Sequence, residues 1–370
     1  MTKSSARAAR RKSEPTSRGG QDRSGAPYDG RRPTINDIAR LADVSKKTVS
    51  RVINESPAVR PETRAKVVSL IKQFGYMPDP QARGLAFRKS FLIGLVYDNP
   101  NAQYIVNIQE GALDAMRGSG YELVVHPCDR KSADFIPGVR HFVERQKLRG
   151  VILLPPIAEN PKLARALDEL GCDYVRIASV HLDEHARMIV SNDRRAAAEA
   201  ARYLESLGHR RIAIITGPDA YRSAHERRAG FLTALEERGV KLPAAMIMEG
   251  GYTFESGVTC AETLLAQKPR PTAIFAANDE MAAGIYRVAY RMGLTIPGDL
   301  SVVGYDDSPV ASRLWPSLTT IRLPIRDMGK LAASKLLGES DGPAGTPAQP
   351  TIVEAHLVVR DSCQSPRQPA

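Results

Sequence analysis

Apolar residues recur at the spacing of an α-helix in three short stretches near the beginning of the chain. The first stretch begins with Thr34 and has Asp37 three residues later, a pairing that is typical of a capped helix start. The second follows the connection 43–45, and the third opens with Pro61 and stops at Gly75. The pattern therefore predicts three short helices, of which the first two are joined by a tight turn.

The second predicted helix has an apolar side and a basic side, and Ser45 is placed to cap it. Two short helices joined by a tight turn, the second with a basic outer face, are typical of a helix-turn-helix that enters the major groove of DNA. A small helical bundle with solvated charges is the alternative. The outward residues are Lys46, Lys47, Thr48, Ser50 and Arg51. The expected shared core is Ile38, Ala42, Val44, Val49, Val52, Val68 and Ile71.

Beyond residue 90, short apolar runs alternate with amphipathic helical stretches. Buried strands that alternate with helices predict an α/β fold with doubly wound parallel sheets. The length exceeds one comfortable core, so we expect two lobes with a ligand cleft where the carboxyl ends of their strands face each other. The predicted strands are 92–96, 121–125, 151–154, 174–177, 211–216, 273–276, 301–304 and 352–359, and the helices between them include 104–116, 193–207 and 280–292.

The net positive charge of the chain comes from its first quarter. Residues 1–32 carry nine Lys and Arg against three acidic residues, and residues 33–90 carry eleven against five. The rest of the chain holds 32 basic and 33 acidic residues and is close to neutral. A basic head on a neutral body is typical of a polyanion-binding module, because neutralised phosphates release counterions. Residues 1–32 are also rich in Ser, Gly and Pro, which equally fits a disordered, solubilising tail.

Composition and motifs exclude several classes of protein. With 42% hydrophobic and 25% charged residues the chain is an ordinary globular protein, and no apolar run is long enough to predict a membrane span or a signal peptide. Four scattered cysteines predict neither a disulfide framework nor a metal site. No phosphate loop, dinucleotide fingerprint or nucleophile elbow occurs, and His209 is interpreted as structural. We expect a cytoplasmic protein without catalytic residues or a cofactor.

The head also resembles a known family. The run TINDIARLADVSKKTVSRVIN at 34–54, with VRPETR at 59–64 and FGYMP at 74–78, closely resembles the DNA-binding head of the lactose/galactose repressor (LacI/GalR) family of bacterial transcription regulators. It departs from the family at Asp43, where most members have glycine. Aspartate tolerates the left-handed backbone better than most residues, so the turn is expected to persist.

The resemblance implies how the head contacts DNA. Lys46 and Lys47 occupy the two positions that read base edges in the family, and Arg51 faces the groove one turn further on. Paired lysines suit the acceptor atoms of guanine. The positions that mostly hold phosphates, and so set the register without reading the sequence, are Thr34, Ser45, Thr48, Ser50, Asn54 and Arg60.

The segment 79–90 resembles the family's hinge, which becomes helical on operator DNA. Its core motif is present as Ala82, Arg83, Gly84 and Leu85, although Gly84 favours a helix less than the usual residue there. The resemblance makes Leu85 the apolar wedge that kinks the central base step from the minor groove. A role as a simple linker residue is the alternative.

The body, from Ile93 to Arg360, resembles the periplasmic-binding-protein-like core of the same family. The stretches that carry this resemblance are GHRRIAIITG at 208–217, ANDEMAAG at 277–284 and VVGYDD at 302–307. The expected domains are a disordered basic tail at 1–32, the helix-turn-helix domain at 33–78, the hinge helix and linker at 79–90, the effector-binding and dimerisation body at 91–360, and a disordered C-terminus at 361–370.

The resemblance also implies an effector site in the cleft. Arg227 stands at the arginine that contacts the effector in many members, and a guanidinium grips paired hydroxyls or a carboxylate. Polar forks beside aromatic rings are typical of a sugar pocket. The implied contacts are Tyr104, Ser223, Arg227, Tyr252, Phe275, Asn278 and Asp306. As alternatives, Asp306 caps a turn, Phe275 fills the core, and Arg227 pairs with a nearby acid.

Two departures from the family limit the choice of effector. Several members carry a second carboxylate where this sequence reads Arg176-Ile-Ala178-Ser179, and Leu154-Pro155 replaces a polar residue. A simple galactoside is therefore not implied, and Asn99 and Asn101 are candidates for the missing contacts. A sugar or sugar derivative is favoured over a purine or an amino acid.

These observations predict a sequence-specific transcription regulator, a repressor of carbohydrate-utilisation genes, that is controlled by a small sugar-like effector. No leucine heptads follow the body, so we expect a homodimer on a palindromic operator, with no membrane or metal partner. A solute-binding protein for sugars without a DNA role is the alternative, but it needs an export signal and no basic head. An enzyme that acts on the same sugar would need a catalytic pair in the cleft.

Overall fold

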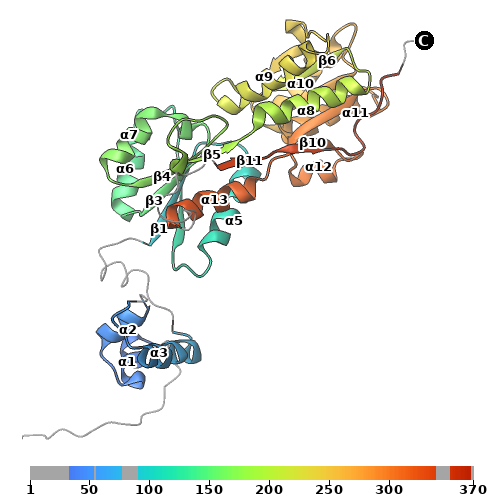
Figure 1. Ribbon diagram of the computed structural model, residues 1–370. Helices are drawn as coiled ribbons and strands as arrows, with labels where there is room; N and C mark the ends of the chain where they lie inside the picture. Colours follow the sequence, from blue (N-terminus) through green and yellow to red (C-terminus); the bar gives the residue numbers. More distant parts are fainter. Residues whose placement is uncertain (1–32, 54–55, 77–90, 339–350, 368–370) are drawn as a thin grey trace, which may run out of the picture. The chain divides into compact units, whose positions relative to one another are not determined.

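A computed structural model of the chain describes residues 33–53, 56–76, 91–338 and 351–367, and Figure 1 shows its elements. The chain forms two compact units, Met1–Asp79 and Pro80–Ala370, which are described separately below as the head and the body. Several residues with a predicted role in DNA binding lie outside the described ranges. They are Asn54 and the hinge residues Ala82, Arg83 and Leu85.

Three helices form the head, and their ends follow from local sequence. They are α1 (Ile35–Ala42), α2 (Lys46–Ile53) and α3 (Pro61–Phe74). At the start of α1 the Asp37 backbone N–H donates to the Thr34 hydroxyl at 3.4 Å, and the Thr34 backbone N–H donates to the Asp37 carboxylate at 2.9 Å. Asp43 ends α1 in the left-handed region with φ 56°, and the Ser45 hydroxyl accepts from the backbone N–H of Thr48 at 3.1 Å. The expected caps and tight turn are present.

The core of the head differs from the prediction at one position of α3. Ile38, Val49 and Val67 are fully buried, whereas Val68 is 37% exposed, so the assignment of Val68 to the core was wrong. The reason is helical phase. Val67 lies four residues before Ile71, on the same face of α3, and each helical residue turns the side chain by about 100°, which points Val68 outward.

This difference gives a test of the packing of the head. Val67→Ala is expected to lower the free energy of unfolding of the head by about 1–2 kcal/mol, because it removes buried methyl groups and leaves a cavity. Val68→Ala should change it by less than about 0.5 kcal/mol. Hydrogen exchange of the full-length protein, read on peptides from α1 to α3, measures both variants. An equal loss of protection in the two would contradict the packing described.

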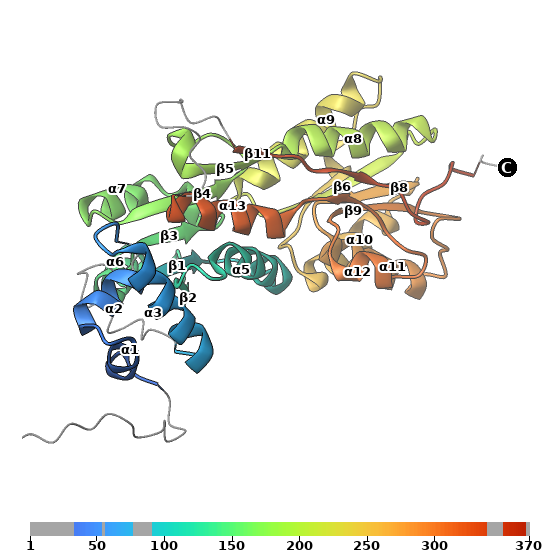
Figure 2. The same cartoon turned by 60° about the horizontal axis from the view of Figure 1, so that its bottom comes forward.

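The N-terminal lobe of the body is built on a parallel sheet with the strand order β11-β5-β4-β3-β1-β2 (Figures 1 and 2). Helices cover both faces, which is why β3 is buried along its whole length. One face carries α5 (Ala102–Met116) and α13 (Ile325–Leu337), and the other carries α6 (Phe135–Gln146) and α7 (Pro161–Glu169). The strands are β1 (Leu92–Tyr97), β2 (Glu122–Pro127), β3 (Gly150–Leu153), β4 (Asp173–Ala178), β5 (Met188–Ser191) and β11 (Thr351–Val353).

The C-terminal lobe repeats this architecture with the strand order β12-β10-β9-β8-β6-β7, in which β12 alone runs antiparallel to its neighbour. One face carries α8 (Asp193–Ser206) and α9 (Arg222–Glu236), and the other carries α10 (Phe254–Ala266) and α11 (Asp279–Arg291). The strands are β6 (Ile212–Thr216), β7 (Ile247–Glu249), β8 (Ala273–Ala276), β9 (Ser301–Asp306), β10 (Thr319–Arg322) and β12 (His356–Val358). The two-lobed α/β fold that the sequence predicts is confirmed.

The main errors of the strand prediction lie where the chain passes between the lobes. The predicted strand 352–359 is two short strands, β11 and β12, in different sheets. The chain leaves the first sheet because Asn192 binds both backbone groups of Ala355, accepting from its N–H at 2.7 Å and donating to its carbonyl at 3.2 Å. Further crossings follow β5 and β10. The prediction also missed β5, β7 and β10, which are only three or four residues long.

The C-terminal segment 361–367 is packed against the C-terminal lobe, which corrects the expected disorder for these seven residues. Ser362 is fully buried, and its hydroxyl accepts from the backbone N–H of Thr319 at 2.8 Å and donates to the Val302 carbonyl at 2.6 Å. His209 contacts the segment two residues further on, where its Nε2 lies 2.9 Å from the carbonyl oxygen of Gln364. These contacts give His209 a structural role. No described helix combines the length and the apolar character that a bilayer-spanning segment requires.

Candidate functional site

The exposed face of α2 is polar and basic. Lys46, Lys47 and Arg51 are exposed, while Val49 and Val52 on the opposite face are buried in the core of the head. The short α2 is therefore held by its apolar side and presents cations to solvent, the arrangement that a phosphate backbone and the edges of bases require.

The other predicted DNA contacts in the described ranges lie at or beside helix starts. Thr34 and Ser45 lie just before α1 and α2, and Arg60 precedes the first residue of α3. Backbone N–H groups at helix starts favour anions, so these positions suit phosphate contacts. The half-buried Thr48 and Ser50 lie within α2. The structure thus gathers all of the described candidates onto helix starts and one helix face.

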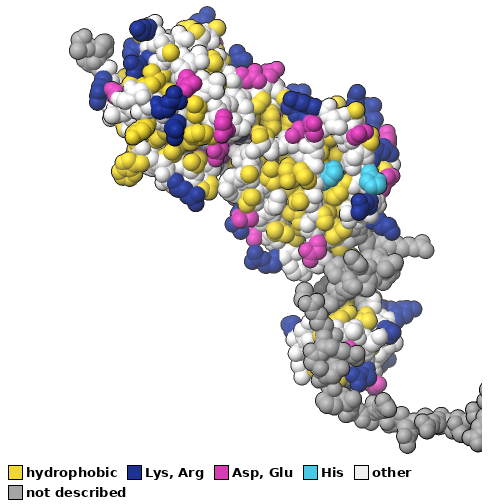
Figure 3. All heavy atoms as spheres, turned by 180° about the vertical axis from the view of Figure 1, so that it is seen from behind, with side chains coloured by type: hydrophobic (Ala, Val, Ile, Leu, Met, Phe, Trp, Pro, Cys, Tyr) yellow, Lys and Arg dark blue, Asp and Glu magenta, His cyan; other side chains and the backbone are white. Residues whose placement is uncertain are grey.

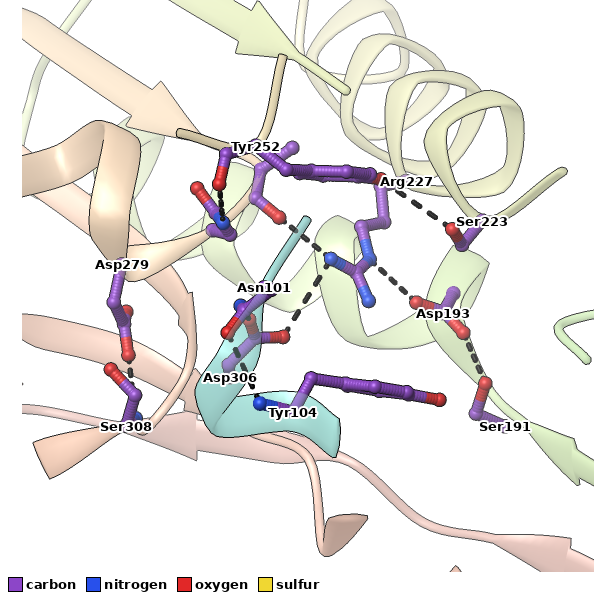
Figure 4. Close-up of polar contacts among 12 residues, drawn as sticks. Asn101, Tyr104, Ser191, Asp193, Ser223, Arg227, Tyr252, Asp279, Asp306 and Ser308 are labelled. Carbon is purple, nitrogen blue, oxygen red and sulfur yellow. Dashed lines mark hydrogen bonds and ion pairs between the residues drawn. The ribbon is translucent and has the colours of Figure 1, made fainter. Parts of the chain in front are cut away.

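A second candidate site is a cavity between the two lobes of the body. It lies at the carboxyl ends of strands from both sheets. Six of the seven implied effector contacts line it, namely Tyr104, Ser223, Arg227, Tyr252, Asn278 and Asp306. Asn99, Asn101 and Pro155 line it as well. Figure 4 shows the polar side chains converging on this cavity from both lobes.

Arg227, on α9, lies at the centre of the polar contacts in the cavity (Figure 4). Its Nε donates to the Asp193 carboxylate at 2.6 Å, and one terminal nitrogen donates to the Ala277 carbonyl at 2.6 Å and lies 3.8 Å from the Asp306 carboxylate. The ring of Tyr305 stacks against the guanidinium, 3.6 Å from ring centroid to carbon. The side chain is 7% exposed, so the structure holds a positive charge, paired with carboxylates, inside the cleft.

Asp193 is the charged site residue that sequence reasoning missed, along with lining residues such as Tyr221, Ser179 and Ser191. It is 1% exposed and begins α8, directly after the chain leaves β5 for the C-terminal lobe. Its carboxylate accepts from Ser179 Oγ at 2.8 Å, from Ser191 Oγ, and from Arg227. It places a second carboxylate in the cavity, in addition to that of Asp306. An acidic residue at the junction of a short apolar run and a helix was the available signal, but the prediction did not include the strand β5.

Burial and charge act in opposite directions on Asp193. Burial alone would raise the pKa of this carboxyl, but the guanidinium of Arg227 and the hydroxyls of Ser191 and Ser179 outweigh burial and hold the pKa below its ordinary value. Asp193 is therefore ionised at neutral pH and forms a buried ion pair with Arg227.

Asp306 ends β9 in a strained conformation and faces the same guanidinium. Its φ is 107°, and φ is also positive at Asp307 (53°) and at Tyr252 (61°), which places three unusual backbone conformations around one cavity. Burial raises the pKa of Asp306 to about 7, with Arg227 opposing the rise and Asp193 adding to it. Asn101 of the N-terminal lobe donates to this carboxylate across the cleft at 3.5 Å.

The predicted residues Ser223, Tyr252 and Asn278, together with Tyr221, which was not predicted, form an aromatic and amide wall. Tyr221 and Tyr252 meet edge to face with ring centroids 5.2 Å apart, and the Tyr252 hydroxyl lies 3.4 Å from that of Ser223. Asn278 is largely committed to the protein itself, since its amide donates to the Tyr252 carbonyl at 2.9 Å and accepts from the Met281 N–H at 3.0 Å. Asn278 thus fixes the conformation of the wall and of the start of α11.

Phe275 does not line the cavity, which corrects its predicted place in the site. It is fully buried and stacks on Phe231, with ring centroids 4.6 Å apart. Phe275 lies inside β8, and its side chain points to the face that α8 and α9 cover, whereas the cavity lies beyond the end of the strand. Its observed role is to fill the core.

Contacts between the lobes close one side of the cleft. The Tyr221 hydroxyl donates to the Asp98 carbonyl at 3.3 Å, and the first backbone N–H of α9, that of Arg222, donates to Glu159 at 3.2 Å. Together with the contact of Asn101 and Asp306, these bonds bridge residues of the two lobes. In the described ranges, no group of three or more His, Cys, Asp or Glu side chains is arranged to hold a metal ion.

Comparisons with known proteins bear on both sites. The family described as "Bacterial regulatory proteins, lacI family" matches residues 34–79, and "Periplasmic binding protein-like domain" matches residues 201–363. The probable HTH-type transcriptional repressor ExuR of Bacillus subtilis is 32% identical over 334 residues, covering 89% of this chain and 98% of that protein. The HTH-type transcriptional regulator CelR of Thermobifida fusca is 34% identical, covering 90% and 98%.

Solved structures match the chain over the same range. A lac repressor dimer bound to operator and the anti-inducer ONPF has 29% identity and a TM-score of 0.72, covering 90% of this chain and 100% of that chain. A complex of the regulator CelR with cellobiose has 32% identity and a TM-score of 0.65, with the same coverage.

The helix-turn-helix head and the two-lobed binding body define a DNA-binding transcription regulator with a periplasmic-binding-protein-like core. The chain belongs to the lacI family of bacterial regulatory proteins, and the family resemblance noted in its sequence is confirmed. Members of this family are DNA-binding transcriptional regulators and not enzymes.

Proposed function

We propose that the protein is a homodimeric repressor of carbohydrate-utilisation genes that binds a palindromic operator and is controlled by a sugar-like effector in the interlobe cleft. The observation that carries the proposal is the cavity in which Arg227, Asp306 and two tyrosine rings converge from both lobes. A guanidinium and a carboxylate suit paired hydroxyls, and aromatic rings suit the apolar faces of a sugar. The exposed basic face of α2 supplies the DNA-binding half of the proposal.

The effector acts through the relative position of the lobes. Bonds such as that of Asn101 to Asp306 join the lobes at the cavity, so a ligand bound there changes the balance between lobe arrangements. A ligand that weakens DNA binding must, by linkage, bind less tightly to the DNA-bound protein. The relatives support this reading, since one matching structure is of a repressor dimer bound to operator and another is of a regulator in complex with cellobiose.

Selection of bound duplexes from fragments of genomic DNA tests this function. The purified protein is incubated with the fragments at near-physiological salt, with and without a panel of sugars. Enrichment of a palindrome that a sugar reduces is the expected result, and the genes beside it identify the pathway. Enrichment of no sequence under any condition would contradict sequence-specific regulation. A Lys46→Ala/Lys47→Ala double variant is the control, because it removes the two expected base-reading cations and keeps the body intact.

Effector binding is expected to weaken as the pH falls through about 7. Ionised Asp306 is a charged acceptor for sugar hydroxyls, and its raised pKa of about 7 means that below that pH protonation removes the charge and turns one of its oxygens into a donor. The charged groups around it are Arg227, Asp193, Glu280 and Asp279, and the titratable hydroxyls around it are those of Tyr104, Tyr252 and Tyr305. Calorimetric titration should show affinity about tenfold lower at pH 6 than at pH 8. Asp306→Asn should bind more weakly and lose this dependence, and an unchanged pH profile in that variant would remove Asp306 from the proposal.

A further inference from the structure

More negatively than positively charged side chains line the effector cavity. Of its lining residues only Asp193, Arg227 and Asp306 carry a formal charge, so two carboxylates face one guanidinium. The rest of the lining supplies hydroxyl, amide and apolar groups, and no lysine, histidine or second arginine belongs to it. The cavity is therefore neutral or negative before any ligand enters, depending on the protonation of Asp306.

Asp193 already pairs with the guanidinium of Arg227, the positively charged group that an acidic ligand would need. Its carboxylate lies 2.6 Å from Arg227 Nε, and two serine hydroxyls fix it in place. The pair is almost completely buried, with side chains 1% and 7% exposed, so solvent does not weaken the attraction. An anionic ligand would compete with a carboxylate that is already held in the best position beside the guanidinium.

The part of Arg227 that remains available suits a hydroxyl. Nε and one terminal nitrogen are bound to Asp193 and Ala277, while the other terminal nitrogen donates to none of the described residues. Figure 4 shows the guanidinium between Asp193 and Asp306, above the ring of Tyr104. A hydroxyl has both an acceptor and a donor, so it can accept from a guanidinium nitrogen and donate to a carboxylate such as Asp306. A carboxylate or phosphate only accepts, and it would face the negative charge of Asp306.

We infer that the effector is an uncharged, hydroxyl-rich sugar, and that Asp193 is the specificity-determining residue that excludes acidic sugars such as uronates and sugar phosphates. This inference rests on the proposed function of the cleft and narrows it. An acidic sugar is rejected because its negative charge is repelled by the carboxylates in the buried cavity. The site thus discriminates by an unfavourable contact with the wrong ligand and not by a better fit to the right one. Asp193 touches Arg227 and positions it, and so acts on the ligand through that guanidinium.

Matched pairs of ligands test the inference on the full-length protein. Thermal-shift and calorimetric titrations compare D-glucose, D-galactose and cellobiose with D-glucuronate, D-galacturonate, glucose 6-phosphate and cellobionate. Wild type is expected to bind the uncharged member of a pair at least about tenfold more tightly. Asp193→Asn keeps the shape of the side chain and removes its charge, so it should reduce or invert this preference. Glu255→Gln, which removes an exposed acid of α10 outside the cavity, is the matched control and should behave as wild type.

The outcomes separate this inference from the proposed function. An acid that wild type binds more tightly than its uncharged partner would overturn the inference and leave a sugar-controlled regulator standing. An unchanged preference in Asp193→Asn would overturn the role of Asp193. Binding of neither member of any pair would overturn the sugar-like effector itself, and this inference with it. The wild-type ranking is a sufficient test alone, so the inference stays open to refutation even if Asp193→Asn destabilises the crossing between lobes.

Discussion

Replacing Arg227 with methionine is expected to lower the free energy of unfolding of the body by about 3–5 kcal/mol, because it leaves the buried carboxylate of Asp193 without its counter-charge. Methionine retains much of the volume of the side chain, so the loss reflects charge more than packing. Urea unfolding followed by far-UV circular dichroism measures the change. Arg326→Met is the matched control: Arg326 also pairs with two carboxylates, those of Asp114 and Glu110, but is 56% exposed, and its replacement should change stability little.

A second substitution separates charge from geometry in this ion pair. Asp193→Asn in the Arg227→Met background is expected to recover part of the lost stability, because the unpaired buried charge is gone. In conditions where the single variant Arg227→Met is folded, this variant should bind DNA normally and fail to respond to the effector. Additive losses in the double variant would contradict a direct pairing of the two residues, and a normal effector response in Arg227→Met would remove Arg227 from the site.

The ends of the head's helices were predictable because local sequence determines them. Thr34 and Asp37 form a cap within four residues, and Asp43 adopts the left-handed turn that the family usually builds with glycine. The position of Val67 was not predictable in the same way. Val67 and Val68 are identical in chemistry and lie four and three residues before Ile71, both of which are helical spacings, so the packing of α1 and α2 against α3 decides which phase is buried.

In the body, the alternation of strands and helices predicted the α/β fold and the length predicted two lobes, but neither predicted the crossings between the lobes. The break between β11 and β12 depends on Asn192, which lies more than 160 residues earlier in the chain. The same crossing places Asp193 in the cavity, so the prediction missed both features for one reason. A contact over that sequence distance leaves no periodic signal in either segment.

In the candidate site, some residues were assigned correctly from the sequence and others were not. Asp306 and Arg227 were assigned to the site through the family resemblance, and both line the cavity, Asp306 at the end of β9 and Arg227 on the second turn of α9. Phe275 was misplaced because it lies inside β8 and not beyond the end of the strand, and a side chain inside the strand packs against the covering helices. The partner of Arg227 was an open alternative, and the structure resolves it as Asp193.

Lys47→Ala is expected to relax base preference at one operator position, whereas Arg60→Ala should weaken binding to all sequences alike. Lys47 is exposed on the outer face of α2, where its ammonium is placed to reach base edges, and Arg60 precedes α3, where it is placed to hold a phosphate. Loss of the base contact should cost about 1–3 kcal/mol on the preferred operator and less on operators changed at that base pair. Loss of the phosphate contact should reduce the slope of the logarithm of the binding constant against the logarithm of the salt concentration by about one, because one fewer counterion is released.

Binding isotherms on the selected operator and its single-base-pair variants, each at two salt concentrations, distinguish the two roles. Lys72→Ala, which removes an exposed cation in the last turn of α3, is the control for the loss of one positive charge from the head. If Lys47→Ala lost the same free energy on matched and altered operators, Lys47 would be a phosphate contact, and the base-reading face of α2 would have to lie elsewhere. If Arg60→Ala changed the ranking of operators, the start of α3 would contribute to sequence recognition. The contrast between the two variants therefore tests how the described part of the head is oriented on DNA.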